Sequence, residues 1–166
     1  MSLSRRTFLG TGGLVLAGLA LPAFGAGEPV DIRMRGDATG ADVWFDPWGL
    51  RVAPGATLRW RNDDPGNSHS TTAYHPDNRK HPLRMPEGAR PWNSDYLLPG
   101  ETFEIMLTVP GVYDYFCIPH EMAGMIGRIV VAEPDSAPPV AVRDESLMFS
   151  FPSVADIMRL GAVHRS

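Results

Sequence analysis

Short segments in which apolar and polar residues alternate, separated by turn residues, constrain the fold of this chain more than any other feature. In residues 30–35 every second residue is apolar, and Pro54-Gly55 and Pro110-Gly111 are typical turn pairs. A period of two indicates a strand with one buried face. Such segments cover residues 30–35, 57–61 and 101–109, and further strands are predicted at 45–52 (a turn leading into a strand), 70–74, 112–116 and 125–131. No helical period lies between them, so the sequence predicts an all-β chain folded as a β-sandwich.

The composition limits what this sandwich can contain. The chain has 166 residues, enough for one domain with additional segments, and carries a formal net charge of −4. Cys117 is its one cysteine, which rules out an intramolecular disulfide. It has no basic stretch and no interleaving of aromatic with basic residues, so we expect no nucleic-acid partner.

The first 27 residues have the layout of an export signal. Arg5-Arg6 is followed by a run rich in Gly, Ala and Leu with no charge up to Gly27. The pair of arginines before Thr7-Phe8-Leu9 resembles the twin-arginine signal, so residues 1–27 are predicted to direct export, to the periplasm for example, and to be removed. A membrane anchor is the alternative, but residues 8–21 are Gly-rich and short of the roughly 20 residues that a span needs. We expect no membrane span after signal removal.

Two further segments depart from the strand pattern. Residues 75–99 contain five prolines and no period, which marks a Pro-rich insertion. After a predicted domain at 28–133, residues 134–166 form a Pro-rich linker and a C-terminal extension. Within it, Ser153 is expected to cap a short helix that ends before Gly161 and packs on its own domain.

The residues with the clearest chemistry lie on one loop between two predicted strands. Cys117, His120 and Met125 place a thiol, an imidazole and a thioether within nine residues. Soft sulfur ligands select copper, and a site of two histidines and a cysteine with a weak axial methionine is the blue-copper arrangement. His69, at the start of another predicted strand, supplies the missing imidazole. Met122 competes with Met125 as the axial ligand.

Two other interpretations of Cys117 remain open at this point. It could be a buried core cysteine, which is common in proteins. It could also be a nucleophile with His120 as its base, although nothing in the sequence indicates an oxyanion hole or an orienting group.

The loop resembles the copper loop of plastocyanin and pseudoazurin, members of the cupredoxins. The shared features are Cys-x-x-His, a Met eight residues after the Cys, and Pro119 and Gly124 before the His and the Met. The similarity extends over residues 30–132. It implies the cupredoxin fold, a Greek-key β-sandwich, with one type 1 copper ion and electron transfer as its function. Carried over by position, the copper ligands are His69, Cys117, His120 and Met125.

The resemblance also implies how the protein works. It predicts an electron carrier that is not an enzyme, with transient redox proteins as donor and acceptor and with His120 as the point of electron exit. Gly124 is expected to leave room beside the metal, and the Ser70 hydroxyl is expected to tether the two ligand loops where relatives have Asn. The alternative is a protein for copper storage or delivery. Four further potential ligands keep it open: His75, His81, Met85 and Met122.

The insertion is predicted to be an ordered cover over the flank of the sandwich near the copper end. We expect it to shape a docking surface and to orient an acidic partner without binding copper itself. The residues assigned to that surface are Tyr74, Met85 and Trp92, with positive charge from Arg79, Lys80, Arg84 and Arg90.

Overall fold

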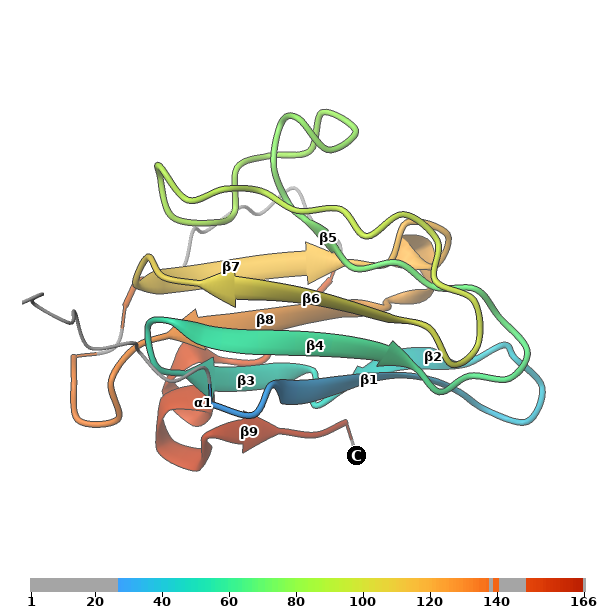
Figure 1. Cartoon of the computed structure of the whole chain (residues 1–166), viewed down its shortest axis with the longest axis horizontal. Helices are drawn as coiled ribbons and strands as arrows, with labels where there is room; N and C mark the ends of the chain where they lie inside the picture. The colour runs from blue at the N-terminus through green and yellow to red at the C-terminus, as the bar shows by residue number, and fades with distance from the viewer. Residues whose placement is uncertain (1–26, 138, 141–148, 166) are drawn as a thin grey trace, which may run out of the picture.

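The computed structural model describes residues 27–137, 139–140 and 149–165, so the predicted signal segment lies outside the described residues except for Gly27. Two sheets stack face to face, the first in front of the second in Figure 1. The first sheet has the order β2 (Val43–Asp46), β1 (Val30–Gly36), β4 (Ala56–Asn62), β6 (Thr102–Leu107). The second has the order β5 (Thr72–Ala73), β7 (Gly111–Phe116), β8 (Ile126–Val131), β3 (Gly49–Val52), β9 (Ala162–Val163). The predicted all-β sandwich is confirmed.

Alternation along the strands places the core between the sheets. In β1, Ile32 and Met34 are buried while Asp31 is exposed, and β1 runs parallel to β4 with Ile32 opposite Trp60. The pairing of β4 with β6 is antiparallel, and β3 pairs with β8 in parallel. Parallel neighbours that are far apart in sequence require the chain to cross between the sheets, and this crossing brings the ends of distant strands together at one end of the sandwich.

Aromatic side chains fill the centre of the core. The rings of Trp60 and Tyr115, from opposite sheets, meet edge to face at 5.4 Å between centroids. The ring of Phe45 lies 4.7 Å from that of Tyr115. The sequence placed Phe45 in a turn, but it belongs to β2, because burying its ring against Tyr115 stabilises a strand there, by about 1.5–3 kcal/mol for a side chain of this size. At Gly127 a Cβ would overlap the ring of Tyr115, so the packing requires glycine.

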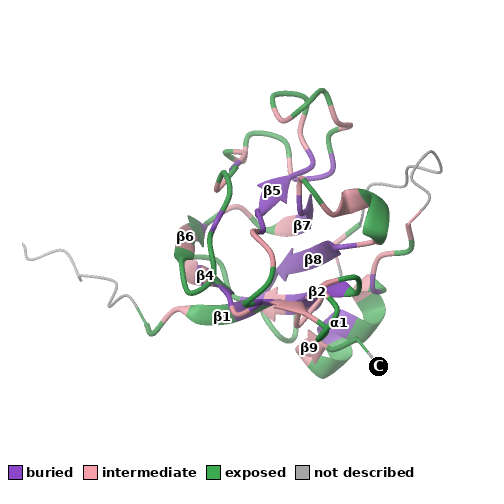
Figure 2. Cartoon of the chain, turned by 90° about the vertical axis from the view of Figure 1, so that its right-hand side faces the viewer, coloured by how far each residue is buried: buried purple, intermediate pink, exposed green. Residues whose placement is uncertain are grey.

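The insertion is an ordered cover, as predicted. Residues 75–99 contain neither helix nor regular strand, and two isolated bridges, His69 with Leu97 and Thr72 with Asn93, attach it to the sandwich. In Figure 1 it passes over β5 and β7. Its buried residues include Met85 and Trp92. Figure 2 shows the fold coloured by burial, with the strands β5, β7 and β8 largely purple.

The C-terminal segment folds onto the second sheet. Ser153 caps α1 (Val154–Leu160) by accepting a hydrogen bond from the backbone N–H of Asp156, 3.0 Å away. Ile157 and Met158 are buried against Val112, Val130 and Ala132, so the predicted helix packs on its own domain. Within the described part of the chain, no helix has the length and apolar character needed to cross a membrane.

A buried ionic cluster joins the insertion, the sheet and the C-terminal segment. Asp114 of β7 accepts hydrogen bonds from Arg84 of the insertion at 2.7 and 3.0 Å and from Arg128 of β8 at 2.7 and 3.0 Å. The two guanidinium groups lie 4.9 and 5.0 Å from the centroid of the Phe151 ring, within the range of cation–π attraction. Arg128 also donates to the carbonyl of Pro152 at 3.0 Å. Because removing one partner of a buried ion pair costs about 3–5 kcal/mol, the three segments are strongly coupled.

Candidate metal centre

The four predicted ligands lie at the end of the sandwich where β7 meets β8. Cys117 directly follows β7 and Met125 directly precedes β8. Between them the chain makes a tight turn, in which the N–H of Met125 donates to the carbonyl of His120 at 3.1 Å and the N–H of Cys117 donates to the carbonyl of Met125 at 3.0 Å. His69 approaches from the loop that follows β4 (Ala56–Asn62).

Three of these residues form a compact set of donor atoms. The Nδ1 atoms of His69 and His120 are 3.1 Å apart, and the Cys117 Sγ lies 3.6 and 3.5 Å from them. Metal bonds to imidazole nitrogen and thiolate sulfur measure about 2.0 and 2.3 Å in zinc sites, so one ion of similar size can bind all three atoms at these separations. Two imidazoles and a thiolate are also the donor set that suits copper. In the described residues this is the one group of three or more His, Cys, Asp or Glu side chains placed to hold a metal.

Burial disfavours the charged forms of the donor groups. His69 and Cys117 are fully buried, whereas His120 is partly exposed. Burial raises the pKa of the Cys117 thiol to about 11. It also lowers the pKa of the His69 and His120 imidazoles, and a neutral imidazole offers the lone pair that a metal needs.

Ser70 connects the two ligand loops, as predicted. Its backbone N–H donates to the Cys117 sulfur at 3.3 Å, and its side-chain oxygen accepts a hydrogen bond from the N–H of Ile118 at 2.8 Å. The residue after the first histidine therefore holds the residue after the cysteine, which fixes the loops relative to each other.

Gly124 has a conformational role that the sequence did not predict. An added Cβ would meet no protein atom within 4 Å, so contacts with other residues do not explain why this position is glycine. Its φ of 82° is the reason, because Gly124 ends the 3-10 turn η1 (Glu121–Ala123) in the left-handed conformation that glycine adopts without strain.

The two methionines of the loop differ in burial. Met125 is fully buried, whereas Met122 is 74% exposed. The extra histidines lie apart from the centre: His81 Nε2 is 3.3 Å from a Glu121 carboxylate oxygen, and His75 Nδ1 is 3.5 Å from Asp77.

One residue at the centre was not predicted from the sequence. The Asp64 carboxylate is 1% exposed, and its Oδ2 lies 2.9 Å from Nε2 of His69. Burial alone would raise the pKa of Asp64, but hydrogen bonds from Asn67, Gly66 and His69 outweigh it and hold this pKa below its usual value. An acidic residue in the polar loop 62–67 is ordinarily solvated, so only its position five residues before His69 hinted at this contact.

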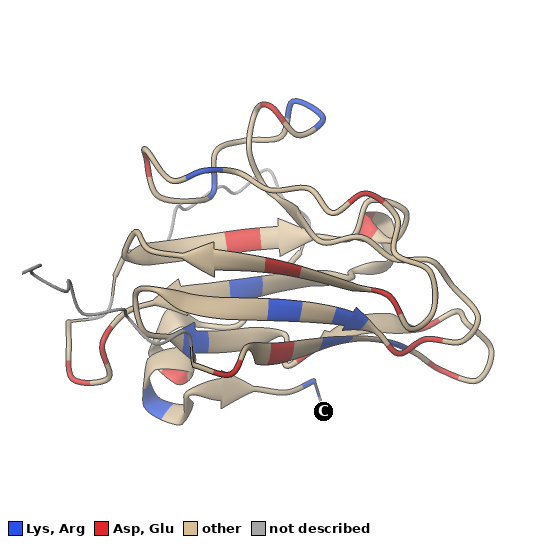
Figure 3. Ribbon diagram, viewed as in Figure 1, with Lys and Arg blue, Asp and Glu red and all other residues tan. Residues whose placement is uncertain are grey.

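The predicted docking surface of the insertion is largely wrong. Tyr74, Met85 and Trp92 are buried, and Arg84 is 4% exposed in its ion pair with Asp114. These side chains secure the cover instead of facing a partner. The exposed cations are Arg79, Lys80 and Arg90; the first two appear as the blue tip of the insertion in Figure 3.

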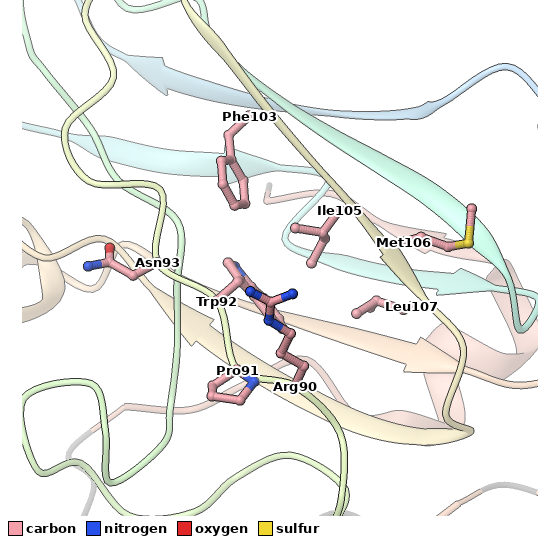
Figure 4. A pocket seen from close by; sticks show the side chains of 8 residues that line it. All are labelled: Arg90, Pro91, Trp92, Asn93, Phe103, Ile105, Met106 and Leu107. Carbon is pink, nitrogen blue, oxygen red and sulfur yellow. The ribbon is translucent and has the colours of Figure 1, made fainter.

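A hollow of about 450 Å³ lies between the insertion and β6 (Thr102–Leu107) (Figure 4). It contains none of the four predicted ligands. Its walls are Arg90, Pro91, Trp92, Asn93, Phe103, Ile105, Met106 and Leu107.

Comparison with known proteins identifies the family. The family model described as copper binding proteins, plastocyanin/azurin family, matches residues 32–132. Chloroplastic plastocyanin of Oryza sativa subsp. indica is 33% identical over 135 residues, which cover 78% of this chain and 82% of the relative. Plastocyanin of Cucumis sativus is 30% identical over 104 residues, 61% of this chain and 99% of the relative. Among solved structures, a pseudoazurin from Sinorhizobium meliltoi is 28% identical, with a TM-score of 0.46, over 66% of this chain and 84% of its own. The chain belongs to the plastocyanin/azurin family of copper-binding proteins, the cupredoxins, and its cofactor is copper.

Proposed function

We propose that the protein is an exported electron carrier whose type 1 copper ion is bound by His69, Cys117, His120 and Met125. The observation that carries this proposal is the buried set of two imidazole nitrogens and one sulfur, 3.1 to 3.6 Å apart. Met125 is the fourth ligand because it is fully buried beside Cys117, whereas Met122 faces solvent. Four protein ligands leave no position for a substrate, which favours a carrier over an enzyme.

Copper supplies the one-electron change between Cu(II) and Cu(I), and the protein supplies a framework that moves little during that change. Hydrogen bonds from Ser70 to Cys117 and from Ile118 to Ser70 fix the ligand loops. The backbone hydrogen bonds among Cys117, His120 and Met125 fix the positions of these three residues relative to one another. A framework of this kind keeps the reorganisation on electron transfer small.

His120 is the proposed point of electron exit, because it is the one histidine of the centre that is partly exposed. Pro119, Met122 and Ala123 beside it are exposed and apolar or small. A small apolar contact suits short-lived redox complexes, which bury little area. Donor and acceptor are therefore proposed to be redox proteins that bind transiently here.

Export is proposed from the sequence of residues 1–27, with Arg5-Arg6 as the recognised feature. A twin-arginine route carries folded proteins, which suits a chain that holds a metal. The periplasm is the expected destination.

The test is the visible spectrum of the copper-loaded protein together with a redox titration. An intense thiolate-to-copper absorption that disappears reversibly on reduction is the expected result. A pale protein that binds copper without this absorption would favour storage or delivery instead.

A further inference from the structure

The carboxylate of Asp64 has a full set of hydrogen-bond partners although it is buried. Its Oδ2 lies 2.9 Å from Nε2 of His69 and accepts a hydrogen bond from the side-chain amide of Asn67 at 2.9 Å. Its Oδ1 accepts from the N–H of Gly66 at 2.8 Å. No Lys or Arg among the described residues approaches this carboxylate within 4.0 Å, so its negative charge faces His69 without a neutralising partner.

Two neighbouring residues, Gly36 and Asn62, make room for this carboxylate and hold its backbone in place. A Cβ at Gly36, the last residue of β1 (Val30–Gly36), would overlap the Asp64 carboxylate, so the absence of a side chain there makes its position available. Asn62 accepts a hydrogen bond from the backbone N–H of Asp64 at 2.9 Å and donates to the carbonyls of Asn67 and Leu97, both at 2.9 Å. The position of Asp64 is therefore set by the fold as well as by its contact with His69.

This contact determines which ring nitrogen of His69 carries no hydrogen and can therefore bind a metal. An ionised carboxylate only accepts hydrogen bonds, so Nε2 of His69 must carry the hydrogen. Nδ1 then keeps its lone pair, and Nδ1 is the atom that lies 3.6 Å from the Cys117 sulfur and 3.1 Å from Nδ1 of His120. The nitrogen without a hydrogen is thus the one that faces the other donors.

We propose that Asp64 is a positioning residue of the copper centre, which holds His69 in the tautomer that exposes Nδ1 and lowers the reduction potential through its negative charge. The proposal rests on the proposed role of His69 as a ligand. Reduction lowers the charge of the metal by one, so a fixed negative charge nearby stabilises the oxidised form more than the reduced form. Partners of this kind orient a ligating histidine and raise its basicity.

The variant Asp64→Asn removes the negative charge but keeps an oxygen that can accept the hydrogen bond from His69. The amide oxygen of Asn can still accept from His69, so we expect the variant to bind copper with its thiolate absorption, at a higher reduction potential than the unaltered protein. Asp63→Asn is the matched control, because Asp63 is the adjacent acid, pairs with Arg33 and Arg61, and makes no contact with His69. The same change of charge there should shift the potential less.

Asp64→Ala removes the contact itself. In the metal-free protein, ¹⁵N NMR should show His69 as the Nε2–H tautomer, and in the Ala variant as a mixture of both tautomers. Copper affinity, measured against a competing chelator, should fall about 10- to 100-fold. The tautomer measurement needs no copper and applies even if a variant loses affinity.

The electrostatic role and the positioning role of Asp64 are tested by separate measurements. A potential in Asp64→Asn that shifts no further than in Asp63→Asn would overturn the electrostatic role. Retention of a single Nε2–H tautomer in Asp64→Ala would overturn the positioning role. If the unaltered protein lacked the thiolate-to-copper absorption, the proposed ligand set would be wrong, whereas the NMR result would still decide whether Asp64 holds His69.

Discussion

The hydroxyl of Tyr74 donates a 2.8 Å hydrogen bond to the carboxylate of Glu121, the residue that follows the proposed ligand His120. Tyr74 is fully buried, and it is the last residue before the insertion. The other oxygen of the Glu121 carboxylate lies 3.3 Å from Nε2 of His81, a residue of the insertion itself. The insertion and the residue that precedes it therefore support the metal-binding loop from outside.

Tyr74→Phe tests this support. Loss of a hydrogen bond to a charged group should reduce the free energy of unfolding by about 1.5–3 kcal/mol and accelerate amide hydrogen exchange in residues 121–124. Tyr113→Phe is the control, because the Tyr113 hydroxyl donates to the carbonyl of Val109, in the loop between β6 and β7. Equal exchange of residues 121–124 in the two variants would show that Tyr74 does not support the loop.

Cys117→Ser should abolish the intense visible absorption, because that absorption arises from charge transfer between thiolate and copper. Ser is close to Cys in size, so the fold should persist, as far-UV circular dichroism would show. Survival of the colour in this variant would mean that Cys117 is not a ligand.

Met125→Leu should still bind copper but raise the reduction potential, because a weak axial thioether tunes the metal without being essential for its retention. Met122→Leu is the matched control, since Met122 is 74% exposed. Redox titration of both variants decides between the two methionines: a shift confined to Met122→Leu would assign the axial position to Met122.

Replacement of the exposed cations of the insertion, Arg79, Lys80 and Arg90, by Ala should slow oxidation of the reduced protein by the anionic complex hexacyanoferrate(III). The effect should be greatest at low ionic strength, since the screening length is only about 10 Å at 0.1 M salt. Arg159→Ala, on the distant helix α1, shows the effect of removing one cation away from the insertion, and each charge removed from the insertion should slow the reaction more than this change does. The visible spectrum should not change; an altered spectrum would place the insertion in the metal site.

Arg5→Lys combined with Arg6→Lys keeps the charge of the N-terminus and removes the arginine pair. If the twin-arginine route is used, precursor should accumulate in the cytoplasm, which fractionation and immunoblotting would detect. Normal export of the double variant would indicate the ordinary secretory route.

Features that depend on residues close together in the chain could be predicted from the sequence. The strands followed from alternation and turn residues. Three of the proposed ligands, Cys117, His120 and Met125, followed from short spacings on a single loop, and His69 followed from its place before a predicted strand and from the family resemblance. The tether through Ser70 was also predictable, because that residue must adjoin His69 wherever the strand lies. In each case the neighbours along the chain determine the outcome.

Contacts between distant segments could not be predicted in the same way. Asp64 and Arg84 are charged residues in polar segments, and only the tertiary structure supplies the His69 and Asp114 that make their burial favourable. The conformation of Gly124 was missed for another reason: glycine serves both close packing and positive φ, and its sequence context does not distinguish them.

The short strand β9 has a consequence for how copies of this protein meet one another. It pairs with β3, and the carbonyls of Gly161 and Val163 accept the N–H groups of Arg51 and Trp48 at 2.7 and 3.1 Å. Without β9, β3 would be an open edge whose unpaired backbone groups could recruit a strand from a second molecule. The actual edge is two residues long and is followed by His164, whose Nδ1 lies 2.6 Å from the Asp46 carboxylate, and by Arg165, which forms an ion pair with Asp42. We therefore expect residues 162–165 to limit edge-to-edge pairing of this sheet with a second molecule.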